Sequence, residues 1–151
     1  MTKQALPHGL WPSPISPTML AGGIRLNDVQ WSPDGNFLVW SQSLDGKTSL
    51  FAKPARDAAF DLSGELNPSG GVGYGGGDFF AGRQGVVFAE RNGRLYFKPY
   101  AEGMTRPLTP AFGGYAAPVL TPDEHNVVFV HTYENKDVLA IAPLDGSAWP
   151  R

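Results

Sequence analysis

The chain has 151 residues, of which 42% are hydrophobic and 12% aromatic, so it is long and apolar enough to bury one ordinary core. Only 17% of the residues are charged, the formal net charge is −2 and no basic stripe occurs, which argues against a nucleic-acid partner. Cysteine is absent, no apolar run approaches the ~20 residues of a membrane span, and the N-terminus lacks the apolar segment of a signal peptide. We therefore expect a protein of the reducing cytoplasm that forms no disulfide and makes no membrane contact.

Residues 1–23 precede the first repeated element and are predicted to form an N-terminal arm. The segment 10–15 is too rich in proline for a helix or a central strand. Ser16 followed by Pro17 is typical of the start of a helix, so one helical turn is predicted here. We expect the arm to pack on another part of the protein through its apolar side chains, which are Trp11, Ile15 and Leu20.

A segment of about 45 residues then occurs three times. Ser-Leu-Phe-Ala-Lys-Pro at 49–54 returns as Arg-Leu-Tyr-Phe-Lys-Pro at 94–99 and, more loosely, as Asp-Val-Leu-Ala-Ile-Ala-Pro at 137–143. An apolar run precedes each copy, and there is little helical periodicity among the 19 glycines and 14 prolines. Short strands repeated at this period predict β-propeller blades.

The predicted fold is therefore all-β, a partial β-propeller of about three four-stranded antiparallel blades with an N-terminal arm. Blade one is assigned to 24–68, blade two to 69–110 and blade three to 111–151, which stops near the start of its fourth strand and is therefore incomplete. The inner strand of blade two is predicted to include the glycine cluster 73–79. The aromatic residues expected to be largely buried are Trp31, Trp40, Phe88 and Phe129.

Two turns connect the first and second strands of blades with recognisable chemistry. Ser-Pro-Asp-Gly at 32–35 is typical of a tight turn, because proline presets φ, aspartate bonds the local backbone and glycine accepts a positive φ. Blade three repeats this turn in degraded form, with Glu124 where a glycine is expected. A different turn, between the second and third strands of blade two, contains Asn-Gly at 92–93, which favours a hairpin turn.

No catalytic, cofactor or metal site is predicted. Residues 71–76 spell Gly-x-Gly-x-x-Gly, but no helical pattern follows, and a dinucleotide site needs a helix N-terminus there. The Gly-x-Ser-x-Gly pentapeptide of serine hydrolases does not occur. The three histidines, His8, His125 and His131, have neither a nameable catalytic partner nor metal-ligand spacing.

Four polar or aromatic side chains could point into the central channel of a propeller, because inner strands and loops face that space. The candidates for lining a substrate channel are Tyr74, Asp78, Tyr133 and Glu134. The alternative is ordinary packing and solvation, which is the favoured interpretation because one sequence does not fix the strand faces.

Three segments resemble a known family. Gly-Leu-Trp-Pro-Ser-Pro-Ile at 9–15, Arg-Leu-Asn-Asp-Val-Gln-Trp at 25–31 and Tyr-Gly-Gly-Gly-Asp-Phe at 74–79 resemble the start of bacterial prolyl oligopeptidase-family serine peptidases. The branch with acylaminoacyl-peptidases and dipeptidyl-aminopeptidase-like enzymes is the most similar. The resemblance implies a propeller, usually of seven blades, that covers a C-terminal α/β-hydrolase domain carrying Ser, Asp and His and admits short peptides.

None of these triad positions falls in the chain, so the resemblance implies a substrate-gating and binding module that is inert alone. Its implied partners are the remaining blades, the hydrolase domain and short peptide substrates, and self-association is left open. Gly73 and Glu124 depart from the family pattern, so no substrate role is carried over to them. The alternative is a non-enzymatic propeller scaffold of the TolB type.

Overall fold

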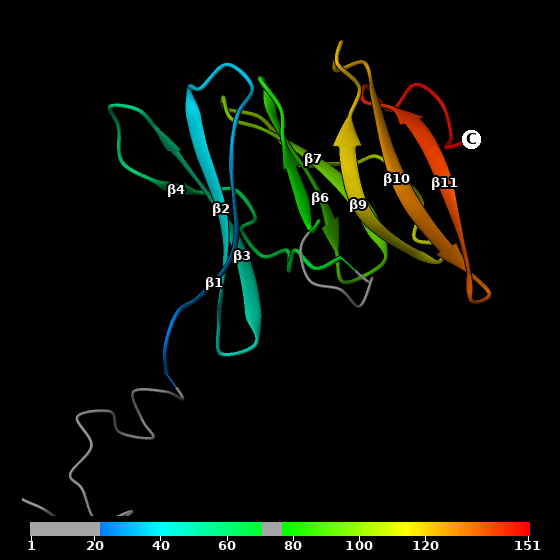
Figure 1. Cartoon of the computed structure of the whole chain (residues 1–151), viewed down its shortest axis with the longest axis horizontal. Coiled ribbons are helices and arrows are strands. Elements are labelled where there is room, and N and C mark those ends of the chain that lie inside the picture. Colours follow the sequence, from blue (N-terminus) through cyan, green and yellow to red (C-terminus); the bar gives the residue numbers. More distant parts are fainter. Residues whose placement is uncertain (1–21, 71–76) are drawn as a thin grey trace, which may run out of the picture.

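A computed structural model describes residues 22–70 and 77–151, and within these ranges the chain forms strands and no helix. The strands make three antiparallel sheets that stand side by side in chain order (Figure 1). The predicted helical turn at Ser16, the arm residues Trp11, Ile15 and Leu20, the candidate Tyr74 and the glycines of 71–76 lie outside the described residues. The sheets are called blades 1, 2 and 3 below.

Blade 1 contains β1 (Arg25–Trp31), β2 (Phe37–Leu44), β3 (Lys47–Pro54) and β4 (Phe60–Asp61), hydrogen-bonded in that order. The predicted turn connects β1 to β2. Gly35 has a φ of 72° and donates its N–H to the Ser32 carbonyl at 2.8 Å, while the Ser32 hydroxyl donates to Asp34 at 2.6 Å. This hydrogen bond, together with that from the Asn36 backbone, holds the pKa of Asp34 below its ordinary value.

Blade 2 contains β5 (Phe79–Ala81), β6 (Gly85–Glu90), β7 (Arg94–Pro99) and β8 (Arg106–Pro107) in the same order. Of the segment 73–79 predicted for its inner strand, residues 73–76 lie outside the described residues, and Gly77 stands outside β5 because its φ of 75° is not extended. A Cβ atom on Gly77 would lie 3.2 Å from the Ala117 Cα of blade 3. The glycine therefore permits a close backbone approach between blades 2 and 3 just before β5.

Blade 3 contains β9 (Gly114–Leu120), β10 (Asn126–Tyr133) and β11 (Lys136–Pro143). Arg151 stands where a fourth strand would begin, since its backbone N–H and carbonyl both pair with Ile141 at 2.9 Å. The second and third strands of all three blades share one register, in which the closing prolines Pro54, Pro99 and Pro143 oppose Phe37, Gly85 and Asn126. Residues at equal distances from these prolines are therefore equivalent between blades.

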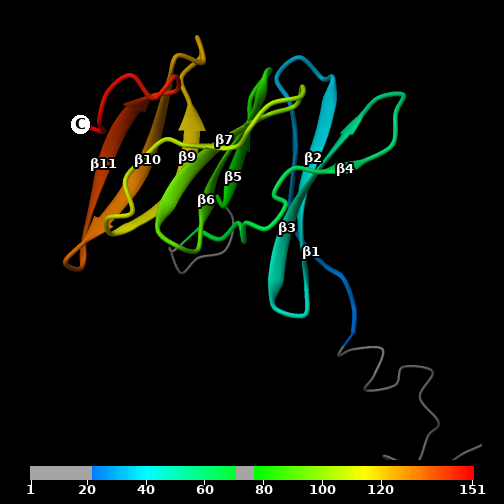
Figure 2. The same cartoon turned by 180° about the vertical axis from the view of Figure 1, so that it is seen from behind.

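Each blade packs one face on the next blade, and the two interfaces hold the core. Side chains of β2, β3 and the segment after β4 meet β5 and β6 in one cluster, which includes Val39, Leu50, Phe79 and Phe88. The matching residues of blade 2 meet blade 3 in a second cluster, which includes Val87, Leu95, Tyr115 and Phe129. Figure 2 shows the same sequence of blades from behind. Burying one such leucine or phenylalanine stabilises the fold by roughly 1.5–3 kcal/mol.

Phe88 and Phe129 are buried as predicted, at 0% and 1% exposure. Trp40 is only half-buried, and the prediction for Trp31 was wrong, because its side chain is 61% exposed. Trp31 opposes Leu38 and Val29 opposes Trp40, so all four side chains lie on the face of blade 1 that turns away from blade 2. Their equivalents in blades 2 and 3 are covered by the preceding blade.

Candidate functional site

Asp78, a predicted channel residue, holds the connection between blades 1 and 2. Its carboxylate accepts the Gly70 N–H at 2.5 Å, and its carbonyl accepts the Ala89 N–H at 2.8 Å. The side chain is half-buried, and a Cβ on Gly70 would lie only 2.9 Å from the carboxylate oxygen. One oxygen of the carboxylate is thus engaged with backbone.

Tyr133 and Glu134 lie at the hairpin between β10 and β11. Tyr133 is 44% exposed and stacks on Phe112 with the ring centres 4.3 Å apart. Glu134 and Asn135 have φ values of 49° and 59°, as a type I′ hairpin turn requires. No hydrogen bond or ring contact within residues 22–70 and 77–151 joins either residue to Asp78, so the described chain does not assemble these candidates into one site.

Of the two histidines among the described residues, His131 packs among aromatic rings and His125 lies in an exposed turn. The His131 Nε2 lies 3.0 Å from the Phe112 carbonyl oxygen, and the ring stacks on Tyr115 at 4.9 Å. His125 is exposed in the turn before β10. Among the described residues, no group of three or more His, Cys, Asp or Glu side chains could hold a metal ion. Within residues 22–70 and 77–151, no helix is long and apolar enough to cross a membrane.

The outward face of blade 1 is an open apolar surface, which we call the blade 1 open face. A hollow of about 590 Å³ lies on it. Trp40 forms part of the floor, stacks on Phe51 at 5.6 Å and donates its indole N–H to Gln42 at 3.0 Å. The equivalent face of blade 2 is buried against blade 1, so the blade 1 open face has the chemistry of a blade interface. Its hollow is lined by Leu26, Asn27, Asp28, Val29, Leu38, Trp40 and Lys53.

The outward face of blade 3, the blade 3 open face, is apolar in the same way. Leu139 on β11 is 79% exposed, whereas its equivalents Leu50 and Leu95 are 0% exposed. Val119 on β9 is exposed on the same blade. Phe129 of β10 lies on the opposite face, in the buried cluster with blade 2. Apolar faces thus lie at both ends of the described row of blades, and exposed apolar patches of this kind are typical of protein contact surfaces.

Two polar contacts that no sequence pattern indicated link neighbouring blades. The Gln30 side chain donates to the Phe79 carbonyl at 2.9 Å and accepts the Ala81 N–H at 3.1 Å, so it bonds the inner strand of blade 2. Glu124 accepts the Arg83 N–H at 3.0 Å through both carboxylate oxygens and also pairs with the Arg83 guanidinium at 3.5 Å. A lone glutamine between Val29 and Trp31 was the sole sequence signal for the first contact.

Glu124 also adds charge near Tyr100. Burial raises the pKa of the Tyr100 phenol well above its usual range, and the carboxylates of Asp34 and Glu124 raise this pKa further. The Tyr100 ring stacks on Phe37 of blade 1 with the centres 3.9 Å apart, and its buried hydroxyl has no hydrogen-bond partner among the described residues. Tyr100 is therefore a neutral packing residue between blades.

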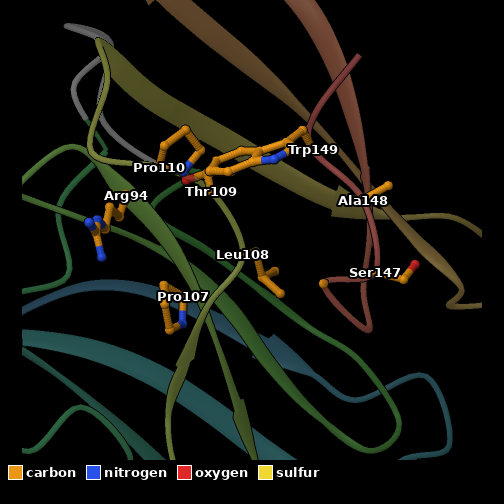
Figure 3. A pocket seen from close by; sticks show the side chains of 9 residues that line it. Arg94, Pro107, Leu108, Thr109, Pro110, Ser147, Ala148 and Trp149 are labelled. Atoms are coloured by element: carbon orange, nitrogen blue, oxygen red, sulfur yellow. The ribbon is translucent and has the colours of Figure 1, made fainter.

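A further hollow of about 440 Å³ lies between blade 2 and the segment after β11. In Figure 3 the Trp149 indole lies beside Pro110 and Thr109, while Arg94 stands apart from it at the left of the view. Its lining mixes polar and apolar groups and includes no pairing of nucleophile and base.

Comparisons with known proteins agree with this architecture. The chain is similar to a puromycin-hydrolyzing peptidase of Mycobacterium tuberculosis, with 28% sequence identity and a TM-score of 0.78 over 97% of the chain. It is also similar to TolB of Acinetobacter baumannii, with 20% identity and a TM-score of 0.59 over 79% of the chain. The matched regions span 24% of the peptidase and 30% of TolB. No family model and no curated protein matches the chain.

The resemblance to the propeller part of a peptidase, expected from three segments of the sequence, is therefore confirmed, as is the predicted partial β-propeller. The likeness to TolB shows the fold alone.

Proposed function

We propose that the chain is the first part of a peptidase propeller that gates and binds short peptide substrates. Hydrolysis, of the acylaminoacyl- or dipeptidyl-peptidase type, is assigned to the Ser, Asp and His of an α/β-hydrolase domain outside residues 1–151. The observation that carries the proposal is the match to the mycobacterial peptidase, which extends over 97% of the chain at a TM-score of 0.78.

The two open faces support a role within a larger propeller. In this proposal further blades pack on the blade 1 open face and the blade 3 open face, as blades 1 and 3 pack on blade 2. A closed ring of blades over a hydrolase site admits narrow, unfolded substrates and keeps bulk water from the acyl-transfer step. The cytoplasm remains the proposed location.

A TolB-like scaffold without enzymatic activity is the second candidate. It is supported by a match over 79% of the chain, although at a lower TM-score of 0.59 and 20% identity. In this case the open faces would still receive further blades, but no hydrolase domain would be joined to them.

The two candidates are separated by the polypeptide that the gene encodes together with this chain. That polypeptide and residues 1–151 alone are purified, treated with a fluorophosphonate that labels activated serines, and assayed with short aminoacyl peptides and with a folded protein substrate. We expect labelling at a serine outside residues 1–151, hydrolysis of the short substrates only, and no turnover by residues 1–151. Absence of both labelling and turnover in the longer polypeptide would decide for the scaffold.

A further inference from the structure

A hollow of about 460 Å³ between blades 2 and 3 is lined by the side chain of Arg106. The Arg106 guanidinium lies over the Phe97 ring, with its central carbon 5.1 Å from the ring centre. This cation–π contact holds the guanidinium in place but uses none of its N–H donors. Within residues 22–70 and 77–151, the guanidinium makes neither a hydrogen bond nor an ion pair. Its donors are therefore available to a ligand in the hollow.

The equivalent position between blades 1 and 2 holds an aromatic ring instead of a cation. Arg106 opposes Phe97 on β7. In blade 1, Phe60 takes the same place opposite Ala52 on β3. The Phe60 ring packs on the apolar cluster between blades 1 and 2. A blade of this chain thus forms with an apolar residue at this position, and the cation at the next junction is a departure from the packing pattern.

A second difference between the two junctions leaves the space open. Tyr100 follows the closing proline of blade 2, stacks on Phe37 and fills the junction of blades 1 and 2. Leu144 follows the closing proline of blade 3 and is the smaller equivalent of Tyr100. Gly85, the equivalent of Phe37, has no side chain to meet it. The junction of blades 2 and 3 therefore lacks this pair of rings, and the hollow lies there.

Further side chains around the hollow can donate hydrogen bonds to the same ligand. Gln84, His125 and Asn126 line it. No hydrogen bond joins these three side chains to other residues within 22–70 and 77–151. The amide groups of glutamine and asparagine and the imidazole N–H are donors, so the lining can satisfy several acceptor sites of one anion.

The carboxylates on the lining are engaged with other partners. Glu124 binds the backbone N–H and the guanidinium of Arg83. Asp145 accepts the Ser147 N–H at 2.8 Å, and hydrogen bonding to Ser147 lowers the pKa of Asp145 below its ordinary value. The charge of Arg106 lowers this pKa further, so Asp145 is an anion with which a ligand must compete.

We propose that the hollow between blades 2 and 3 binds the carboxylate of a peptide, with the Arg106 guanidinium as its ion-pair partner. A guanidinium donates a pair of parallel N–H bonds to one carboxylate, a geometry that a lysine ammonium does not supply. The choice of a peptide as the ligand rests on the proposed function, whereas the choice of a carboxylate rests on the lining alone.

Binding is measured by NMR through the amide signals of Asn126 and Leu144 in the full chain, at constant ionic strength. Acetyl-trialanine with a free C-terminal carboxylate is compared with its C-terminal amide and with acetyl-Ala-Glu-Ala amide, which carries a side-chain carboxylate only. We expect the carboxylate peptides to shift these signals and the neutral amide to leave them in place. The tighter of the two carboxylate peptides identifies whether the chain terminus or an acidic side chain is the preferred source.

Substitutions assign the binding to the guanidinium. Arg106→Gln should raise the dissociation constant of the carboxylate peptides roughly tenfold, and Arg106→Lys, which keeps the charge without the planar fork, should recover only part of the loss. Asp145→Asn removes the competing anion and should tighten binding about two- to threefold. Arg56→Gln, on an exposed loop of blade 1, is the matched control and should bind as the original chain does.

The amide signals of Leu50 and Leu95 report whether each variant keeps its fold. Equal shifts with the neutral amide, unchanged binding in Arg106→Gln, or no shift with either carboxylate peptide would overturn the proposal. Weaker binding in Asp145→Asn would also count against it. Absence of binding here, together with hydrolysis of short peptides by the longer polypeptide, would remove this site and leave the proposed function standing. Binding here without such hydrolysis would do the reverse.

Discussion

Glu124 reaches from the turn before β10 to the preceding blade, where both of its carboxylate oxygens accept the Arg83 N–H at 3.0 Å. It does so from a φ of 55°, a left-handed conformation that glycine adopts at little cost and other residues disfavour. The interblade contact therefore offsets local backbone strain at this position.

Two substitutions of Glu124 should separate the contribution of the interblade contact to stability from the cost of the backbone strain. Glu124→Ala loses the contact and keeps the strained backbone, so we expect the free energy of unfolding to fall by ~1–3 kcal/mol. Glu124→Gly loses the same contact but relieves the strain, so it should be less destabilised than the alanine variant by up to ~1 kcal/mol. Chemical denaturation measures both, and an alanine variant as stable as the original would contradict the role of the contact.

Gln30 is expected to stabilise the junction of blades 1 and 2. Gln30→Leu leaves the Phe79 carbonyl and the Ala81 N–H without their partner, which should cost ~1–3 kcal/mol in unfolding free energy. Gln42→Leu is the matched control, because Gln42 opposes Leu26 on the blade 1 open face and makes no hydrogen bond to blade 2 among the described residues. Equal losses in the two variants would show that the interblade bonds contribute nothing measurable.

The loss of stability on replacing an aromatic residue by alanine should depend on whether another blade covers the face on which the residue lies. Phe88→Ala and Phe129→Ala each empty a buried position and should cost ~3–5 kcal/mol. Trp31→Ala removes an exposed side chain and should change stability by less than ~1 kcal/mol. A large loss for Trp31 in the isolated chain, measured by urea denaturation, would mean that its face is covered in solution.

Replacing the buried serines Ser41 and Ser63 of blade 1 by alanine should have different effects on stability. The Ser41 hydroxyl is buried without a hydrogen-bond partner among the described residues, so Ser41→Ala should leave stability unchanged or raise it. Ser63 donates to Asp61 and accepts the Leu50 N–H, so Ser63→Ala should cost ~1–3 kcal/mol. Thermal unfolding of both variants checks this, and a clear loss for Ser41→Ala would reveal a partner for its hydroxyl.

Acid should weaken the turn between β1 and β2. The hydrogen bond from Ser32 lowers the pKa of Asp34 from its ordinary value of 3.8, so the charged carboxylate is favoured in the folded chain. The resulting stability is present above pH 3.8 and is lost as the pH falls through the lowered pKa. Asp34→Asn should flatten the acid limb of the unfolding profile, while Asp57→Asn, on an exposed loop, serves as the control. An unchanged profile in Asp34→Asn would contradict the assignment.

The repeat, the tight turn at Ser32 and the burial of Phe88 could be predicted because they depend on local spacing and on agreement between copies. The face of Trp31 could not, because one blade's apolar side chain is buried only where another blade covers it. The contacts of Gln30 and Glu124 span 49 and 41 residues of sequence, and no local pattern indicates them. Asp78 was predicted to line a channel because it is a polar residue near an inner strand. The hydrogen bond that its carboxylate accepts from the Gly70 N–H could not be predicted from this position.

Blade 2 contributes a face to both apolar clusters, whereas blades 1 and 3 contribute to one each. In such a row the opening free energy is a sum of blade and nearest-neighbour contributions, so it is highest in the middle and lowest at the two ends. Blades 1 and 3 can each detach while leaving one cluster intact, but blade 2 cannot unfold without dissolving both. The central blade is therefore the last part of the described chain to lose its structure, and any coupling between the two ends passes through it.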